Sequence, residues 1–284
     1  MTDKLTIIDE KAKGISRRTF LFGGSIVGFG LLGDGFLRQP TSLEVRRNRI
    51  PSDKLPAGQS LRIVHLSDLH LQSYNRYFEK VAHETNRLDP DLILLTGDYV
   101  EEARNLSGVL EFLDQLEAPG RTFAVQGNWE YWALIEGERL QKRFQESGVK
   151  LLINQRDDVD WNGMPLSLLG IDFPSSSASL HSLIKSADPS RINIALSHVP
   201  AFQHDILEDK VDLVLCGHTH GGQVRLPLVK PFHLPRHSGS FVDGLYHVGR
   251  KNMPLYVSRG IGTSILPVRL FCRPEINLIE LYGT

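Results

Sequence analysis

Leu61–His70 reads Leu-Arg-Ile-Val-His-Leu-Ser-Asp-Leu-His, a short apolar strand followed at once by two side chains that can bind a metal or form a turn. The apolar run, rich in β-branched residues, ends at Ser67, and Asp68 and His70 come directly after it. Runs of this length and composition are typical of strands buried on both faces. In open α/β sheets, ligands bind beyond the carboxyl ends of the strands. Since residues two apart on an extended chain point the same way, we expect Asp68 and His70 to reach one cation.

The composition indicates a globular protein that does not bind long nucleic acids. The chain has 284 residues, of which 41% are hydrophobic and 23% are charged, as in ordinary globular proteins. Its formal net charge is −1. Binding to a long nucleic acid depends on neutralising many phosphates, so this charge argues against such a partner. We expect one large α/β domain over residues 60–284.

The N-terminal residues look like an export signal. Ser16–Leu21 reads Ser-Arg-Arg-Thr-Phe-Leu and is followed by the glycine-rich apolar run Phe22–Gly33. This is similar to a twin-arginine signal, with the frequent lysine after the core replaced by Phe22. We therefore expect residues 1–37 to be a signal or membrane anchor, the twin-arginine translocase to be a partner, and the periplasm or cell envelope to be the location. A buried helix is the alternative, but six glycines from residue 21 to residue 35 would each cost about 1 kcal/mol relative to alanine.

Whether the N-terminal signal is cleaved or retained stays open. No small-x-small cleavage site follows the apolar run, which favours an uncleaved signal that acts as a membrane tether. The run is, however, shorter than the ~20 residues of a spanning helix, which argues against a tether. Cleavage and a membrane tether are therefore both retained as alternatives.

Residues 38–59 are expected to be a linker with one edge strand at Ser42–Arg46. Cys216 and Cys272 could pair, although a buried free thiol fits the apolar surroundings of Cys216 better.

The pattern of the first strand recurs four times along the chain. The predicted strands at 91–95, 121–125, 192–196 and 211–216 run into Asp98, Asn128, His198, and His218 with His220. Further strands are predicted at 149–153, 166–170 and 255–258, and helices at 74–88, 106–116, 134–147, 180–186 and 201–207. A polar group buried without a partner costs about 1–3 kcal/mol, so unrelated loop residues are a poor explanation for this series. The five strand ends predict a metal site.

The series D-x-H, G-D, G-N, a single histidine after a strand, and G-H-T-H resembles the calcineurin-like metallophosphoesterase family over Leu61–Leu281. The resemblance implies an α/β fold, a two-sheet αββα sandwich with a dinuclear metal site at the carboxyl ends of the strands. It places one metal ion on Asp68, His70 and His220, the second on Asn128, His198 and His218, and Asp98 between them. It also implies catalytic roles for Asp98, Asn128 and His198. Mixed nitrogen and oxygen ligands do not distinguish Mn, Fe, Zn, Ni and Co.

The resemblance implies hydrolysis of a phosphodiester or pyrophosphate by a water that two divalent ions activate. With the export signal, the chain looks most like the bacterial twin-arginine-exported phosphodiesterase branch. That branch is similar to lipid A pathway pyrophosphatases that act on UDP-2,3-diacylglucosamine, so a lipid-linked substrate is retained as an alternative. An alternative of another class is a metal-binding envelope protein without turnover.

One position departs from the family pattern. Many members carry a histidine directly after Gly-Asn that protonates or stabilises the leaving group, whereas this chain has Trp129. An indole has no proton to give at a useful pKa. We therefore expect leaving groups that need little protonation, such as a nucleoside monophosphate or an aryl alcohol.

Candidate substrate-binding residues lie around the predicted ligands. Trp129 has aromatic neighbours at Tyr131 and Trp132, which could stack a base or simply pack a helix. Arg225 and His237 belong to a basic loop after the last ligand, and Arg259 follows the strand at 255–258. Solvated loop charges are the alternative for Arg225 and His237, and Arg259 is a candidate wall of the pocket. His65, inside the first strand, is expected to be a core histidine.

Overall fold

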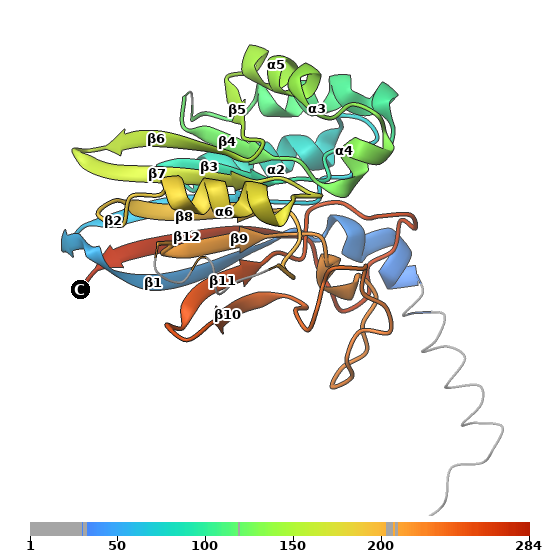
Figure 1. Cartoon of the computed structure of the whole chain (residues 1–284). Coiled ribbons are helices and arrows are strands. Elements are labelled where there is room, and N and C mark those ends of the chain that lie inside the picture. The colour runs from blue at the N-terminus through green and yellow to red at the C-terminus, as the bar shows by residue number, and fades with distance from the viewer. Residues whose placement is uncertain (1–29, 31–32, 119, 203–206, 208–209) are drawn as a thin grey trace, which may run out of the picture.

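The computed structural model describes residue 30 and residues 33–118, 120–202, 207 and 210–284 (Figure 1). The expected export signal at 1–37 therefore lies almost wholly outside the described residues, as does much of the helix predicted at 201–207. Among the described residues, no helix has both the length and the apolar composition needed to cross a membrane.

Two mixed sheets of six strands each form the centre of the described chain. The first has the order β1 (Glu44–Ala57), β12 (Glu275–Gly283), β2 (Ser60–Leu66), β3 (Leu92–Thr96), β4 (Thr122–Val125), β5 (Val149–Leu151). The second has the order β10 (Gly244–Val248), β11 (Met253–Val257), β9 (Leu213–Cys216), β8 (Ile192–Ser197), β7 (Met164–Ile171), β6 (Gln155–Trp161). Strands β2 to β5 are parallel, and so are β7, β8, β9 and β11, so each set directs its carboxyl ends to one edge.

Helices cover the outer faces of both sheets (Figure 1). They are α2 (Arg76–Arg87), α3 (Leu106–Leu113), α4 (Asn128–Trp132), α5 (Glu138–Glu146) and α6 (Ser177–Ser186), with short turns η1 (Asp34–Arg38), η2 (Gln39–Thr41), η3 (Ala103–Asn105) and η5 (His220–Gly222). Helices α2, α3 and α5 pack on the first sheet, and α6 packs on the second.

Strand β3 illustrates how the sequence builds three apolar layers. Leu92 and Leu94 face the core between the two sheets, whereas Ile93 and Leu95 face the helices that cover the first sheet. Successive side chains of a strand point to opposite faces, so a strand buried on both faces must be apolar at every position. The observed layers confirm the expected αββα sandwich.

The helix predicted at 134–147 is wrong at its start. Helix α5 begins only at Glu138, and a separate short helix, α4, begins at Asn128. Leu134, just after α4, has a positive φ of 57°, and Gly137, the N-cap of α5, has φ 78° and ψ −151°, so neither residue continues an α-helix. Apolar spacing alone did not reveal this break.

Strand β1 is much longer than the edge strand expected within the segment at 38–59. It has 14 residues and runs parallel to β12 at the edge of the first sheet. Its mixed polar sequence includes Pro51, which an edge strand tolerates because one side of its backbone needs no partner strand. Residues 44–57 therefore form part of the first sheet.

We expect His65 of β2 to make the stability depend on pH. Its side chain is fully buried, its Nε2 lies 2.8 Å from Thr96 Oγ1, and burial lowers its pKa to about 3. The unfolded chain binds this proton near pH 6.5, so stability is lost as the pH falls below that value. We expect the loss to reach about 1.4 kcal/mol per pH unit from this group. A His65→Gln variant should lose that slope, measured by urea unfolding from pH 6.5 to 5 with a chelator present.

The matched control is His83→Gln, which changes an exposed histidine of α2. Its unfolding free energy should follow that of the wild type across the same pH range. Parallel profiles for the wild type and His65→Gln would show that His65 does not carry the effect.

Candidate metal centre

The seven side chains predicted as ligands meet at the edge where the carboxyl ends of the parallel strands lie, and all seven are buried. The structure places six of them in two groups, Asp68, His70, Asp98 and His220, and Asp98, His198 and His218. Within each group the candidate ligand atoms lie within 4.8 Å of one another. Asn128 joins the second group, because its Oδ1 lies 3.1 Å from His198 Nε2. The two groups share Asp98.

The backbone at these ligands is not extended. Five of them have positive φ angles: Asp68 (52°), His70 (41°), Asp98 (56°), His218 (74°) and His220 (50°). The reasoning from an extended D-x-H pair is therefore wrong, although both side chains do reach one group. Left-handed backbone is uncommon outside glycine and clusters at functional sites. Here the chain turns sharply as soon as each strand ends, and the turn directs the side chain into the site.

Two glycines allow these turns to approach one another. A Cβ on Gly127 would collide with the carboxylate of Asp98, and one on Gly217 would collide with Ser67 and Asp68. Backbone hydrogen bonds then join the loops, from Asp68 N to Gly97 O at 3.0 Å and from Gly217 N to His198 O at 3.0 Å. Glycine is needed where backbone packs directly against a functional side chain.

The first group has the spacing of ligands on one cation. The Nε2 atoms of His70 and His220 face each other at 3.0 Å, and Asp68 Oδ1 lies 3.5 Å from His220 Nε2. His70 Nδ1 faces Glu101 Oε1 at 3.2 Å, which favours a proton on Nδ1 and a free lone pair on Nε2. Two nitrogen ligands about 2.1 Å from one ion and at right angles would be about 3.0 Å apart. These residues therefore fit a bound metal ion.

The second group is oriented in the same way. His198 Nδ1 lies 2.7 Å from the carbonyl oxygen of Thr96 and donates to it, so His198 Nε2 faces Asp98 Oδ2 at 3.1 Å. His218 Nε2 donates to the carbonyl oxygen of Arg236 at 2.6 Å, which leaves its Nδ1 3.1 Å from His198 Nε2. A hydrogen bond to the outer nitrogen selects the tautomer whose inner nitrogen can bind a metal.

The charges of Asp98, His218 and His220 suit a cation, whereas His198 has to release a proton to bind one. Burial raises the pKa of Asp98, but the charge and hydrogen bond of His198 lower that pKa by a larger amount, so that the result is about 2. Burial lowers the pKa of His198, and Asp98 raises it by more, to about 9. Burial lowers the pKa of His218 to about 4 and that of His220 well below the ordinary value. Near pH 7, Asp98 is ionised and these last two imidazoles are neutral, which are the forms that bind a cation.

Glu130 lies outside the predicted site residues but supports two of them. Its fully buried carboxylate accepts hydrogen bonds from the backbone N–H groups of Asp98 (3.0 Å), Tyr99 (2.7 Å) and Gly127 (2.7 Å). Burial, and next the charge of Asp98, raise the pKa of Glu130 to about 7. Its position three residues after Gly127, the N-cap of α4, is the spacing of a capping box and is the signal that could have identified it.

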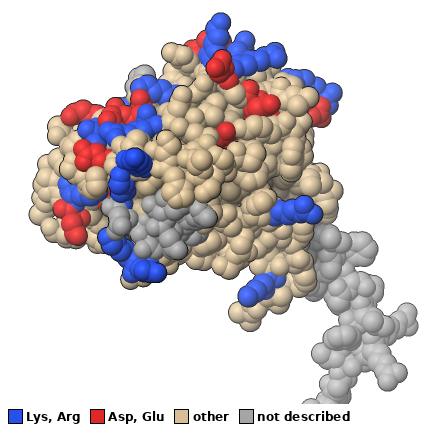
Figure 2. Space-filling model, in the orientation of Figure 1, with Lys and Arg blue, Asp and Glu red and all other residues tan. Residues whose placement is uncertain are grey.

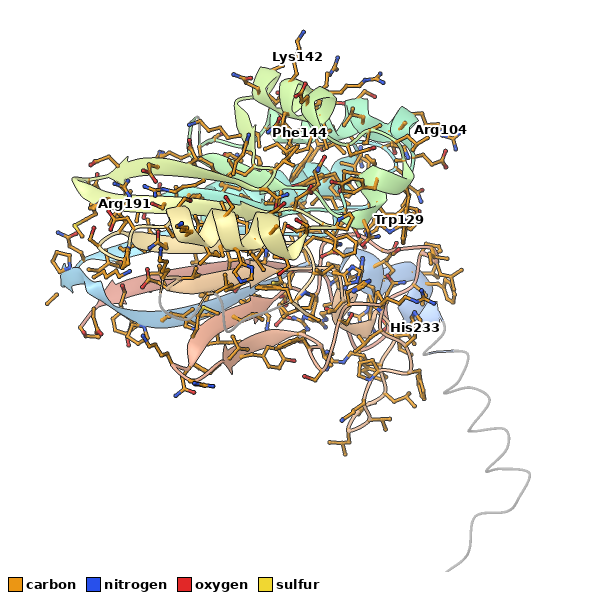
Figure 3. The ribbon with its side chains drawn as sticks, in the orientation of Figure 1. Arg104, Trp129, Lys142, Phe144, Arg191 and His233 are labelled. Carbon is orange, nitrogen blue, oxygen red and sulfur yellow. The ribbon has the colours of Figure 1, made fainter. Side chains whose placement is uncertain are left out.

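Trp129 and His237 lie beside the two ligand groups. The ring of Trp129 packs edge-on against the ring of His70 with centroids 5.7 Å apart, and it contacts Trp132 at 5.0 Å. His237 is exposed, and its ring lies 5.3 Å from that of Phe173, which in turn is 6.5 Å from the ring of His218. Figure 3 shows Trp129 on α4, on the same side of the molecule as the loop that carries His233.

The two predicted arginines are held by carboxylates. Arg225 donates to Asp243 at 2.7 Å. Arg259 is nearly buried, and its guanidinium donates to Glu275 at 2.6 Å and to Glu44 at 3.0 Å. These ion pairs account for the charge of both arginines within the fold, and a role toward substrate stays a prediction.

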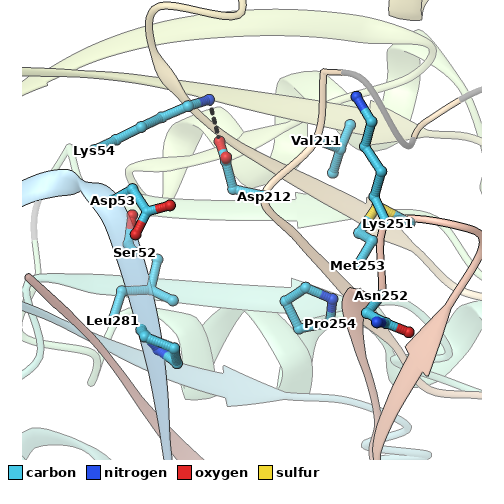
Figure 4. A pocket seen from close by; sticks show the side chains of 11 residues that line it. Ser52, Asp53, Lys54, Val211, Asp212, Lys251, Asn252, Met253, Pro254 and Leu281 are labelled. Atoms are coloured by element: carbon cyan, nitrogen blue, oxygen red, sulfur yellow. Dashed lines mark hydrogen bonds and ion pairs between the residues drawn. The ribbon is translucent and has the colours of Figure 1, made fainter. Parts of the chain in front are cut away.

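A hollow on the molecule lies away from this centre (Figure 4). Its lining includes Lys54 of β1 and Asp212, which form an ion pair at 2.7 Å, and Met253, the first residue of β11. Asp212 directly precedes β9, so these residues mark the amino ends of parallel strands, whereas the ligands follow carboxyl ends. The hollow and the metal centre therefore lie at opposite ends of the parallel strands of the second sheet.

The support from Glu130 can be tested by removing one of its acceptors. In Glu130→Gln, one oxygen becomes an amide NH₂ that cannot accept the backbone hydrogen bonds made to a carboxylate. We expect the affinity for Mn²⁺ to fall about 10–100-fold, as is usual when a group that orients metal ligands is changed. Titration calorimetry on the chelator-treated full chain measures this. Glu111→Gln, an exposed change on α3, should keep the wild-type affinity, and an equal affinity in Glu130→Gln would remove this role from Glu130.

Comparison with known proteins agrees with this geometry. The family model for calcineurin-like phosphoesterases matches residues 61–222. The chain is 31% identical over 287 residues to Phosphodiesterase YaeI of Escherichia coli, covering 94% of this chain and 99% of that protein, and 31% identical over 249 residues to an uncharacterized metallophosphoesterase, YkoQ, of Bacillus subtilis, covering 84% and 91%. The solved structure of Haemophilus influenzae NAD nucleotidase shares the fold with a TM-score of 0.51 at 15% identity, over 72% of this chain and 45% of that longer one. The chain therefore belongs to the calcineurin-like phosphoesterase family and is a phosphoester hydrolase whose Asp/His cluster is positioned for two metal ions.

Proposed function

We propose that this chain hydrolyses phosphodiester or pyrophosphate bonds in the cell envelope, after export by the twin-arginine route. The observation that carries the reaction is the buried Asp98 carboxylate shared by two ligand groups. The sequence Ser16–Leu21 supports the route of export. The E. coli relative that is named a phosphodiesterase supports the bond type, because the likeness extends over 94% of this chain.

The ligand residues hold and orient the reaction centre. Two divalent ions bound there would supply the chemistry, which is activation of a water and neutralisation of charge on the phosphoryl oxygens. One ion would be held by Asp68, His70 and His220, the other by Asn128, His198 and His218, with Asp98 contributing to both. Asp98 keeps its orientation because its Oδ1 accepts the backbone N–H of Trp129 at 3.0 Å. A site preorganised in this way loses no energy to rearrangement during the reaction.

Trp129 limits the choice of leaving group. Its ring occupies the side of the first ligand group, edge-on to His70, and its indole can donate a hydrogen bond but cannot release a proton at a useful pKa. The departing oxygen therefore has to carry its own negative charge. Nucleoside monophosphates and aryl alcohols do so, whereas simple alkyl alcohols do not. Diesters with an aryl group and nucleotide pyrophosphates are the substrate classes that this wall favours.

A pyrophosphatase of the UDP-2,3-diacylglucosamine type is a second candidate within this proposal. Its leaving group would be a nucleoside monophosphate, which meets the requirement that Trp129 sets. The uncharged sequence at 20–33 supports a location where a lipid-linked substrate is available. A preference for a UDP-linked acylated sugar over bis(p-nitrophenyl) phosphate and UDP would select this candidate.

The shared carboxylate is tested by Asp98→Asn. We expect loss of at least about 10²-fold in turnover of bis(p-nitrophenyl) phosphate, because an electrostatic group at the reaction centre is removed. Metal content measured on the same samples should fall below two ions per chain. The control is Asp114→Asn, an exposed change at the end of α3. Two bound ions in the wild type with no turnover of any tested ester would instead support a metal-binding protein without activity.

The role of Trp129 is tested by Trp129→His. A histidine there can protonate the leaving group, and general acid catalysis is typically worth 10²–10⁴-fold. We expect turnover of an alkyl monoester to rise by about that factor, while turnover of bis(p-nitrophenyl) phosphate changes little. Trp132→His changes the neighbouring exposed tryptophan and should produce no gain. Rapid cleavage of alkyl esters by the wild type, or no gain in the variant, would rule out this explanation.

A further inference from the structure

Most of the exposed large apolar side chains of the described residues gather on three short segments. Nine of the twelve lie there: Phe36 and Leu37 in η1, four from Leu226 to Phe232, and three from Ile265 to Phe271. Leu37, Leu228 and Ile265 have more than 80% of their surface exposed. These three segments are called the apolar surface below. Soluble proteins rarely expose large apolar side chains in such a group unless they contact a partner or a membrane.

The three segments form one connected structure. Arg269 N donates to Gly35 O at 3.0 Å, which joins the segment of Phe271 to η1. Leu270 N donates to Gln223 O at 3.0 Å, and the side chain of Gln223 donates to Leu266 O at 3.1 Å, which join the same segment to the loop of Leu228. The exposed side chains are therefore carried by loops that hold one another in place.

The backbone of these loops presents the side chains in unusual conformations. Leu228, Ile265 and Phe271 have φ angles of 66°, 64° and 50°. Bulky and β-branched residues are rare in this left-handed region, where glycine or asparagine would be favoured. The chain carries large apolar residues at turns where small polar ones would be more stable in water.

Basic residues outnumber acidic ones near the apolar surface, and the one acidic residue within its segments, Asp34 of η1, is paired with Arg38. Residues 223–240 and 263–273 contain no Asp or Glu, but they include Lys230, Arg236 and Arg273. Figure 2 shows Lys and Arg, and no Asp or Glu, on the visible lower right of the molecule. A second copy of this surface would bring like charges together, whereas anionic lipid headgroups attract Lys and Arg. The combination of exposed apolar residues with basic neighbours is typical of contact with a lipid interface.

The position of the surface on the chain fits the same partner. It includes η1, which directly follows residues 20–33, a stretch without a charged residue. The surface also contacts the metal centre, since Ile265 N donates to Glu101 Oε1 at 3.0 Å and Glu101 faces His70. Figure 1 shows η1 and the loops of residues 222–240 and 263–271 on the same side of the sandwich. We propose that the apolar surface inserts into the headgroup region of an anionic lipid bilayer and so holds the metal centre next to the membrane.

The test places a probe on the apolar surface of the full chain. Both native cysteines are buried, so Phe232→Cys can be labelled selectively with a fluorophore that reports polarity. Vesicles of phosphatidylethanolamine and phosphatidylglycerol, with and without brominated acyl chains, are added. We expect a blue shift and quenching by the brominated lipid. The same label on Lys142→Cys of α5, far from His233 in Figure 3, should show neither effect.

A second pair of variants separates insertion of the surface from attachment by the N-terminal residues. In the Phe232→Cys background, Leu228→Ser with Ile265→Ser should weaken the insertion by about tenfold or more, measured as the lipid concentration for half-maximal quenching. Leu134→Ser, which removes an exposed leucine elsewhere, should leave it unchanged. Circular dichroism verifies that each variant is folded.

Three results would overturn the proposal. The first is that the chain fails to sediment with the vesicles. The second is that the chain sediments with them while the label at residue 232 stays unquenched. The third is a blue shift before any lipid is added, which would show that a second copy or the N-terminal residues of the chain itself cover the surface. None of these measurements depends on hydrolysis, so the proposed function and this surface succeed or fail separately.

Discussion

The buried carboxylate of Asp98 is the group on which the rest of the centre depends. It comes from the first sheet, and its closest imidazole, that of His198 at 3.1 Å, comes from the second. A charge removed from water must be balanced by partners in good geometry. The backbone N–H of Trp129, the imidazole of His198 and the hydrogen bonds of Glu130 to the adjoining backbone supply that geometry. The two sheets therefore have to keep their relative position for the site to exist.

The same requirement explains the local strain. Left-handed conformations cost about 1–3 kcal/mol each for residues other than glycine, and five ligands adopt one. Such conformations persist because the surrounding structure determines them, here through apolar layers on both faces of each sheet and backbone hydrogen bonds between the loops. The packing of the sandwich offsets the free-energy cost of these conformations. The ligand side chains are therefore held in positions that a short peptide would not maintain.

In the function proposed above, selectivity follows from what surrounds the ligands more than from the ligands. Trp129 packs edge-on against His70 and forms an apolar wall beside the first ligand group. The loops that carry exposed apolar side chains reach Glu101 and Arg236, which orient His70 and His218. Contact between these loops and another surface would therefore act on groups that orient two ligands, without changing a ligand.

Much of this molecule could be predicted from the sequence alone. Apolar runs such as Leu92–Leu95 are typical of strands buried on both faces, and polar residues that follow several such runs are expected to meet where parallel strands end. That local pattern indicated an α/β fold and the seven candidate ligands, and the family resemblance implied the two-sheet sandwich. The tertiary structure decided the rest, because it depends on contacts between distant residues: the left-handed turn at Asp68, the support of Asp98 by Glu130, the ion pairs of Arg259, and the union of three separate segments into one apolar surface. The sequence shows the type of each residue and its neighbours along the chain. Only the packing of the folded chain determines which distant residues contact it.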